Sequence, residues 1–305
     1  MTKHEAIIVG AGPAGLAAGL YTSRAGLKSL LIERGISGGQ MVNATLVENY
    51  PGFVDGISGS ELGSLMHRQA TKYGLELVTA EVTGITTGQS HLVSTTEGSF
   101  EAATVIIAAG SEYRKLGAIG EERLIGHGVS YCATCDGFLF RGREVAVVGG
   151  GDTAITDALE LSRHVTKVHV IHRRDQLRAG HVLQQRAFAH PKLDFIWDTV
   201  VEEVIGQELV KGLKLSNVKT EQRSILELDG VFVAIGFMPN SQCFFNILDL
   251  NDAGYIITDE TMATSVNGIF AAGDIRRNSP RQIAAAVGDG VTAAMSAFRY
   301  LQNMG

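Results

Sequence analysis

The sequence predicts an α/β protein made of two doubly wound units, each with a mostly parallel sheet between helices. Three observations support this prediction: the length, an internal repeat and an excess of glycine. A chain of 305 residues is typical of about two domains. Glycine makes up 37 of the 305 residues, about 12%, against an average near 7%. Such an excess indicates many turns, or many close approaches of the backbone to bound molecules.

One stretch of sequence occurs twice, with an offset of 139 positions. Residues 5–34 read EAIIVGAGPAGLAAGLYTSRAGLKSLLIER, and residues 144–173 read EVAVVGGGDTAITDALELSRHVTKVHVIHR. Each copy begins with a short β-branched run, which is typical of a buried parallel strand. A glycine turn, an amphipathic stretch and a second apolar run follow. Each copy therefore predicts a strand–helix–strand unit.

The offset aligns the small residues of two glycine turns. They are Gly10, Gly12 and Gly15 in the first copy and Gly149, Gly151 and Ala154 in the second. In such a turn the first glycine permits the tight bend, the second lets the backbone approach a pyrophosphate, and the third residue allows close helix–strand packing. The helix N-terminus then presents free N–H groups to the phosphates. Two such turns predict two Rossmann-like dinucleotide-binding sites.

The residue that closes the second strand distinguishes the two sites. In the first copy it is Glu33, whose carboxylate can accept hydrogen bonds from a free ribose hydroxyl. In the second copy it is His172, and Arg173, Arg174 and Arg178 follow it. Guanidinium groups suit a 2′-phosphate, although a solvated strip of surface arginines is the plainer alternative. The first site therefore fits FAD, and the second fits NADPH rather than NADH.

Cys132 and Cys135 form a CxxC pair in the heptad YCATCDG. A structural zinc site needs four ligands, usually as two such pairs, and the only other cysteine in the sequence is Cys243. The pair therefore indicates a redox dithiol and no metal, and Cys243 is expected to be a small core residue. Asp136 follows the pair directly. It could give and take the proton of thiol chemistry, or it could be a turn or cap residue.

Charge and hydropathy narrow the class of protein. The formal net charge of −6 argues against nucleic acid as a partner. The first apolar run starts almost at the N-terminus, and no run approaches the ~18 residues of a membrane span. We therefore expect no signal peptide and no membrane segment, and a cytoplasmic protein.

The sequence resembles the low-molecular-weight thioredoxin reductases of bacteria and archaea, essentially from end to end. The stretches that carry the resemblance are GAGPAG (10–15), GGQ (38–40), ENYPG (48–52), YCATCDG (131–137), GGGDTA (149–154), HRRDQLRA (172–179), AIGFMPN (234–240), FAAGDI (270–275), and RQI with AVGDG (281–290). The CATCDG and HRRDxxRA motifs together are highly specific.

The resemblance implies a set of site residues. The catalytic residues would be Cys132, Cys135 and Asp136. FAD would be held by Gly10, Gly12, Pro13, Ala14, Gly15, Glu33, Arg34, Gly38, Gly39, Gln40, Asn49, Val82, Gly110, Gly273, Asp274, Arg281, Gln282 and Ile283. NADPH would be held by Gly149, Gly151, Asp152, Thr153, Ala154, His172, Arg173, Arg174, Arg178 and Ile235.

The resemblance also implies an architecture and a mechanism. Residues 1–113 and 245–305 would form a discontinuous FAD domain, and residues 114–244 an inserted NADPH domain with the cysteine pair. Hydride would pass from NADPH to the flavin, and Cys135 would face the flavin. Cys132 would attack the disulfide of thioredoxin or a thioredoxin-like protein. The resemblance also implies a homodimer. Because nicotinamide and the disulfide both need one flavin face, while the pair must also reach a partner, we hypothesise that rotation of the inserted domain alternates the two.

Other functions stay open beside this one. They are a reductase fed by ferredoxin or another flavoprotein, the flavoprotein partner of a peroxiredoxin, a dithiol oxidase, and a flavin-bound redox sensor. The intact arginine motif argues against the first and the third, and the start of the chain at its first strand argues against the second. The cysteine pair argues against plain ferredoxin or flavodoxin NADP reductases.

Overall fold

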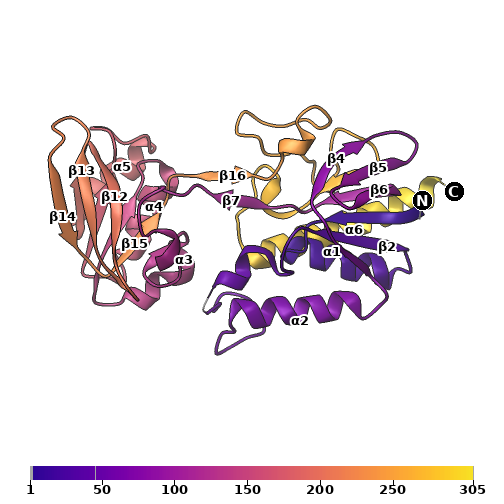
Figure 1. Cartoon of the computed structure of the whole chain (residues 1–305), viewed down its shortest axis with the longest axis horizontal. Coiled ribbons are helices and arrows are strands. Elements are labelled where there is room, and N and C mark those ends of the chain that lie inside the picture. The colour runs from indigo at the N-terminus through magenta and orange to yellow at the C-terminus, as the bar shows by residue number, and fades with distance from the viewer. Residues whose placement is uncertain (1–2, 45, 305) are drawn as a thin grey trace. The chain divides into compact units, whose positions relative to one another are not determined.

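The computed structural model describes residues 3–44 and 46–304 (Figure 1). The chain divides into two compact units, Met1–Glu112 with Met238–Gly305 as the first and Tyr113–Phe237 as the second. The second unit is thus inserted in the sequence of the first. Both units contain a mostly parallel sheet and helices, so the predicted α/β class is confirmed.

The first unit is built on a mixed sheet with the strand order β3-β2-β1-β6-β5-β4 and β17 beside β6. Its strands are β1 (Lys3–Val9), β2 (Ser29–Glu33), β3 (Glu76–Thr79), β4 (Val82–Thr86), β5 (His91–Thr95), β6 (Gly98–Ile107) and β17 (Ile269–Ala271). Its helices are α1 (Pro13–Arg24), η1 (Gly39–Asn43), α2 (Gly59–Thr71), η4 (Gln242–Phe244), η5 (Gly273–Ile275) and α6 (Ile283–Met304). The pairs among β3, β2, β1, β6 and β17 are parallel, and β4, β5 and β6 form an antiparallel meander.

Alternation along β1 divides the core of the first unit into two layers. The side chain of Ile8 packs with residues of α1 and α6, whereas Ile7 and Val9 pack on the other face of the sheet with Phe244. All three strand residues are at most 5% exposed. Successive side chains of a strand point to opposite faces, so one short run serves both layers.

The second unit contains an all-parallel sheet, in the order β11-β10-β9-β15-β8, and an antiparallel sheet, in the order β12-β13-β14. Its strands are β8 (Val129–Ser130), β9 (Glu144–Val148), β10 (Lys167–Ile171), β11 (Leu193–Ile196), β12 (Thr199–Gly206), β13 (Val210–Asn217), β14 (Arg223–Glu227) and β15 (Gly230–Val233). Its helices are η2 (Glu122–Leu124), α3 (Ala133–Asp136), η3 (Gly137–Phe140), α4 (Asp152–Leu161) and α5 (His181–Phe188). The chain passes between the units in β7 (Ser111–Tyr113) and β16 (Phe237–Pro239), which pair with each other.

The two copies of the repeat have the same fold and the same strand register. The first forms β1-α1-β2 and the second forms β9-α4-β10, each with parallel strands. Ile8 pairs with Leu31 in the first copy, and Val147 pairs with Val170 at the equivalent positions of the second. The prediction of two strand–helix–strand units is confirmed. Over residues 3–44 and 46–304, no helix has the length and apolar character needed to cross a membrane.

Candidate active site and nucleotide sites

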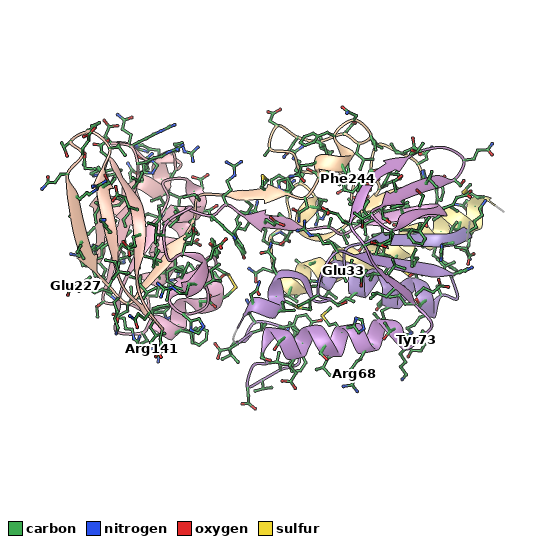
Figure 2. All side chains as sticks on the ribbon, in the orientation of Figure 1. Glu33, Arg68, Tyr73, Arg141, Glu227 and Phe244 are labelled. Atoms are coloured by element: carbon green, nitrogen blue, oxygen red, sulfur yellow. A yellow bond between two sulfur atoms is a disulfide. The ribbon has the colours of Figure 1, made fainter. Side chains whose placement is uncertain are left out.

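The redox pair lies at the start of the short helix α3, in the second unit. Cys132 occupies the N-cap position of α3, and a disulfide joins it to Cys135 across a Cα–Cα distance of 5.3 Å (Figure 2). Both cysteines are half-buried. No cluster of three or more metal-ligating side chains occurs in the part of the chain that the structure describes. The pair is therefore a disulfide, as the sequence predicts.

Asp136 is tied to the cysteine pair through Ser130. The Ser130 hydroxyl donates to Asp136 Oδ2 at 2.6 Å and accepts from the Cys132 N–H at 3.1 Å. Burial raises the pKa of Asp136 above its ordinary value, and the hydrogen bond from Ser130 opposes this rise. Ser130 was not among the residues predicted from the sequence. The available signal was a hydroxyl residue two positions before the first cysteine.

Tyr131, the residue before Cys132, is held by the buried carboxylate of Glu121. Its hydroxyl donates to Glu121 Oε1 at 2.8 Å, and Glu121 also accepts from the backbone N–H groups of Leu116 and Gly117, each at 2.9 Å. Glu121 is only 1% exposed. The Tyr131 ring stacks on Tyr113 with centroids 4.8 Å apart. Burial, followed by the bond to Glu121, raises the pKa of Tyr131. The residue before Cys132 is thus fixed by contacts that sequence spacing did not reveal.

The first glycine turn is closed by Glu33. Its carboxylate accepts from the Ala11 N–H at 2.6 Å and from the Gly35 N–H at 2.8 Å. Gly10 has a φ of +101°, which side chains rarely adopt, and a Cβ at this position would lie 2.5 Å from the Ala108 carbonyl oxygen. A Cβ at Gly12, in contrast, would meet only Gly39 Cα, at 3.9 Å. The backbone at Gly12 is therefore open to a bound group.

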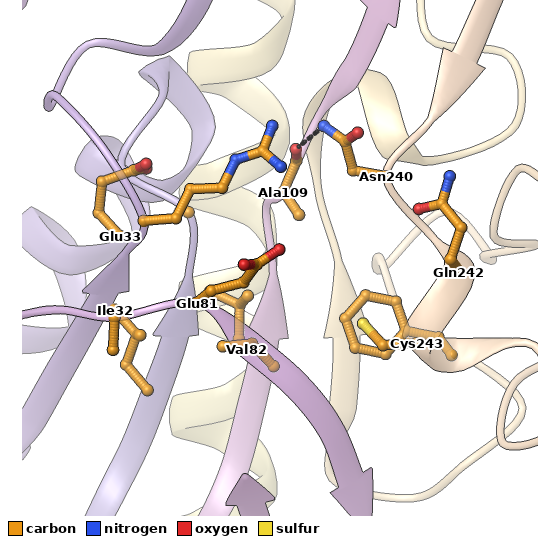
Figure 3. Close-up of a pocket in the computed structure, with 13 residues that line it drawn as sticks. Ile32, Glu33, Glu81, Val82, Ala109, Asn240, Gln242 and Cys243 are labelled. Atoms are coloured by element: carbon orange, nitrogen blue, oxygen red, sulfur yellow. Dashed lines mark hydrogen bonds between the residues drawn. The ribbon is translucent and has the colours of Figure 1, made fainter. Parts of the chain in front are cut away.

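A cavity of about 180 Å³ adjoins this turn in the first unit (Figure 3). It is lined by Val9, Gly10, Ile32, Glu33, Arg34, Ala80, Glu81, Val82, Ala109, Asn240, Gln242, Cys243 and Phe244. Four of the residues predicted to hold FAD contribute to this wall: Gly10, Glu33, Arg34 and Val82. The wall formed by Asn240, Gln242, Cys243 and Phe244 was not predicted from the sequence. Within it, Asn240 donates to the Ala109 carbonyl oxygen at 2.8 Å. Cys243 both packs against the core and lines the cavity.

The cavity and the turn have the properties that the adenosine end of FAD requires. The apolar side chains of Ile32, Val82 and Phe244 supply walls for a planar base, and Glu33 supplies an acceptor for ribose hydroxyls. The exposed backbone at Gly12, at the start of α1, supplies room for a pyrophosphate. The residues of the first unit therefore fit FAD.

The remaining predicted FAD residues come from distant parts of the chain. Asn49 Nδ2 donates to Gln282 Oε1 at 3.1 Å, although 233 positions separate the two residues. Asp274 accepts from the Ser279 hydroxyl at 2.8 Å, and burial raises its pKa. The guanidinium group of Arg281 lies 5.7 Å from the centroid of the Tyr255 ring. Two of the others make side-chain contacts: Arg34 pairs with Glu112, and Gln40 donates to the Ser111 carbonyl oxygen. The rest lie in turns or at helix starts: Gly38 is the N-cap of η1, Gly39 begins η1, Gly110 has a φ of +68°, Gly273 begins η5, and Pro13 and Ile283 begin α1 and α6.

The second glycine turn is folded against the arginine motif. The backbone N–H groups of Arg178 and Ala179 both donate to the Gly150 carbonyl oxygen, at 2.6 and 3.1 Å. Asp152, the first residue of α4, accepts from the Gly180 N–H at 2.7 Å. A Cβ at Gly151 would meet no heavy atom within 4 Å. The turn therefore leaves room for a phosphate group at Gly151.

His172 is buried between this turn and the arginines. It is 5% exposed, and a Cβ at Gly150 would lie 2.4 Å from the His172 ring. Its pKa is lowered by burial and, to a smaller degree, by the positive charges of Arg178, Arg174 and Arg173. The positive charges of the three arginines thus all act on one ring, and their side chains are exposed. Ile235 lies just beyond β15 and packs against the core of the same unit.

Comparison with known proteins identifies the family. The sequence model of the pyridine nucleotide-disulphide oxidoreductases matches residues 4–290. The chain belongs to this family. As a pyridine nucleotide-disulphide oxidoreductase it is an enzyme, and its family implies the use of a flavin and a nicotinamide nucleotide.

Well-matched relatives of this oxidoreductase share its whole length. It is 49% identical to a thioredoxin reductase of Listeria monocytogenes over 304 residues, which cover 99% of this chain and 95% of the relative. It is 47% identical to a thioredoxin reductase of Bacillus subtilis over 303 residues, which cover 99% and 96%. The crystal structure of a thioredoxin reductase from Streptococcus pyogenes superposes with a TM-score of 0.93 at 46% identity and covers 99% of each chain.

Proposed function

We propose that this protein is a thioredoxin reductase that passes electrons from NADPH, through FAD and the Cys132–Cys135 disulfide, to the disulfide of thioredoxin or a thioredoxin-like protein. The observation that carries this proposal is the position of the disulfide. It lies in the unit whose glycine turn is bordered by three arginines, and not in the unit that contains Glu33 and the cavity. Thioredoxin reductases of other organisms that match this chain throughout support the proposal.

The proposal assigns one nucleotide to each domain. The FAD domain would comprise the expected residues 1–113 and 245–305, together with residues 240–244, four of which line the cavity, and the NADPH domain would lie within residues 114–239. The open backbone at Gly12 and the carboxylate of Glu33 support the first assignment. The positive charges of Arg173, Arg174 and Arg178 near His172 support the second, because guanidinium groups form charge-assisted bonds to a 2′-phosphate. When bound, FAD would supply the ability to take a hydride and to release two electrons.

The chain's own groups carry the thiol chemistry. Opening the Cys132–Cys135 bond consumes two electrons and one proton, and it gives one thiol and one thiolate. Asp136, with its raised pKa, would hold that proton beside the pair. The Cys132 thiolate would then attack the partner's disulfide and release one partner thiolate. Cys135, whose thiol proton returns to the Asp136 carboxylate, would attack this mixed disulfide, release the second partner thiolate and restore the intramolecular bond.

An anaerobic titration of the purified yellow protein with NADPH, followed by flavin absorbance, tests the proposed function. We expect uptake of about four electrons per chain, two for FAD and two for the disulfide. Bleaching complete after two electrons would contradict exchange between the flavin and the cysteines. Bleaching by dithionite but not by NADPH would contradict the assignment of the arginine cluster.

The assembly and location of the protein are also part of the proposal. We expect a homodimer in the cytoplasm, as the resemblance to low-molecular-weight thioredoxin reductases implies. Light scattering of the FAD-loaded protein tests the first expectation, because a dimer has twice the mass of the single chain.

A further inference from the structure

The Ser130 hydroxyl lies at the centre of the hydrogen bonds around the redox pair. Ser130 is the last residue of β8 and is 5% exposed. Its oxygen is 2.6 Å from Asp136 Oδ2, 3.1 Å from the Cys132 backbone nitrogen and 3.4 Å from the Cys132 carbonyl oxygen. Three groups of the reacting segment therefore meet at one buried hydroxyl.

Simple donor counting sets the direction of each bond. A serine hydroxyl has one proton to donate and two lone pairs that accept. The proton goes to the Asp136 carboxylate, because a charged acceptor at 2.6 Å competes better than a neutral carbonyl at 3.4 Å. A lone pair then accepts the Cys132 N–H. The Asp136 N–H in turn donates to the Cys132 carbonyl oxygen at 3.1 Å, so the acid and the first cysteine are linked twice.

We propose that Ser130 is a positioning residue that holds the carboxyl group of Asp136 and the backbone of Cys132 in fixed register during the opening of the Cys132–Cys135 bond. This inference rests on the proposed function, because it takes the pair as redox-active. Opening the bond takes two electrons from the reduced flavin and one proton from the Asp136 carboxyl group, and gives one thiol, one thiolate and the Asp136 carboxylate. Ser130 donates to that carboxylate, so it favours release of the proton.

Among the groups around Asp136, Ser130 is the polar contact that lowers the pKa of its carboxyl group. Burial is the largest cause of the raised pKa of Asp136, and the Ser130 bond acts against it. α3 packs against α4, whose titratable side chains are Asp152, Asp157 and Glu160, and His164 follows that helix beside Gly137. η3, with the sequence GFLF, has no titratable side chain. Asp157 is itself a buried acid, with a pKa raised to about 6, so a test must separate it from Asp136.

Infrared spectroscopy of the oxidised FAD-loaded protein can follow Asp136 directly. The band of the protonated carboxyl group is recorded across pH in an Asp157→Asn background and is assigned by its loss in Asp136→Asn. In Ser130→Ala we expect this band to persist to higher pH than in the parent, because the carboxylate loses its donor. Ser130→Thr, which keeps a hydroxyl, should restore the parent's titration. Ser130→Gly serves as a second removal variant if Ser130→Ala does not fold.

Rapid-mixing measurements give the rate of disulfide reduction across pH. A purely structural role of Ser130 would not move the pH dependence of this rate. We expect Ser130→Ala to lower the rate by about tenfold, which is less than the roughly hundredfold or greater loss usual when the proton-transfer group itself is removed, because Asp136 stays in place. Its alkaline limit should move to higher pH, and Ser130→Thr should recover both values. If Ser130→Ala leaves the infrared titration and the pH profile unchanged in protein that still takes up four electrons, the inference is wrong. Uptake of only two electrons by the parent would instead contradict the proposed function, whatever the infrared result.

Discussion

At the scale of single residues, Glu33 and His172 show how one position in a repeated unit acquires two uses. They are equivalent under the offset of 139: Glu33 is the last residue of β2, and His172 directly follows β10. The Glu33 carboxylate bonds to the backbone of its own glycine turn and lines the cavity. The His172 ring fills the space above Gly150. Because no acid occupies this position in the second unit, no carboxylate there offsets the positive charges of the neighbouring arginines.

Neutralising Arg173 and Arg174 together, as Arg173→Gln with Arg174→Gln, should lower kcat/KM for NADPH by about tenfold or more. The reason is the loss of charge-assisted hydrogen bonds to the 2′-phosphate, each of which contributes about 1.5–3 kcal/mol. The value for NADH should change little, since NADH lacks that phosphate. Steady-state kinetics with both nucleotides measure the ratio. Arg186→Gln, at an exposed arginine of α5, is the matched control. If the ratio of the kcat/KM values for NADPH and NADH is unchanged in the double variant, these arginines do not bind the 2′-phosphate.

Asp157 should make the stability of the second unit depend on pH. Burial on α4 raises its pKa from the ordinary value of 3.8 to about 6. A raised pKa means that the folded protein binds this proton more tightly than the unfolded chain, so stability falls as pH rises from about 4 to about 6. Asp157→Asn should therefore stabilise the protein by about 2–3 kcal/mol at pH 8 and hardly at all at pH 4.

Urea unfolding at the two pH values, followed by tryptophan fluorescence, measures this difference. The single tryptophan, Trp197, packs against the core of the same unit. Asp175→Asn is a suitable control, because its carboxylate is exposed and pairs with Lys219. A gain in Asp157→Asn that is equal at both pH values would show that ionisation of Asp157 is not its source.

At the scale of elements, the first unit depends on the close approach of α1 and α6. A Cβ at Gly290 of α6 would lie 2.1 Å from the Ala14 carbonyl oxygen of α1. A Cβ at Gly15 of α1 would lie 1.7 Å from the Gly10 carbonyl oxygen. Both obstacles are backbone atoms, which cannot turn aside as a flexible side chain can. The glycine turn, α1 and α6 therefore form one tightly packed block beneath the sheet.

Gly290→Ala should destabilise the first unit by about 1–3 kcal/mol, as is usual when a methyl group is forced into a well-packed core. Gly288, on the same helix, is exposed, and a Cβ there would meet no heavy atom within 4 Å. Gly288→Ala should therefore stabilise the helix by about 0.5–1 kcal/mol. Urea unfolding followed by circular dichroism compares the two variants. Equal effects from the two substitutions would show that α6 can move away from α1 at little cost.

At the scale of the whole molecule, the chain forms two units with separate cores and two crossings between them. The units also have separate reporters. Trp197 lies in the second unit, and a bound flavin would report on the first. A ligand that binds one unit should therefore change the unfolding signal of that unit and leave the signal of the other unchanged. This difference tests the assignment of nucleotides to domains.

NADP⁺ at about a hundred times its Kd should stabilise the second unit by about 2.7 kcal/mol. We expect a higher midpoint in thermal unfolding followed by Trp197 fluorescence, with little change in the temperature of flavin release. Added FAD should raise the temperature of flavin release and leave the Trp197 transition in place. A rise in flavin-release temperature with NADP⁺, with the Trp197 transition unmoved, would reverse the assignment.

Features that depend on short spacing along the chain were predictable from the residues alone. The two glycine turns, the shared register of β1-β2 and β9-β10, and the CxxC disulfide all follow from residues close together in the chain, where backbone sterics and local hydrogen bonds decide the conformation. The tertiary structure alone decided the contacts between distant segments: Asn49 with Gln282, Glu121 with Tyr131, and residues 240–244 as a wall of the cavity. Such contacts form only after remote elements have packed, so no local pattern encodes them. Ser130 lies between these cases, since it is near the pair in sequence but its role depends on where β8 ends against α3.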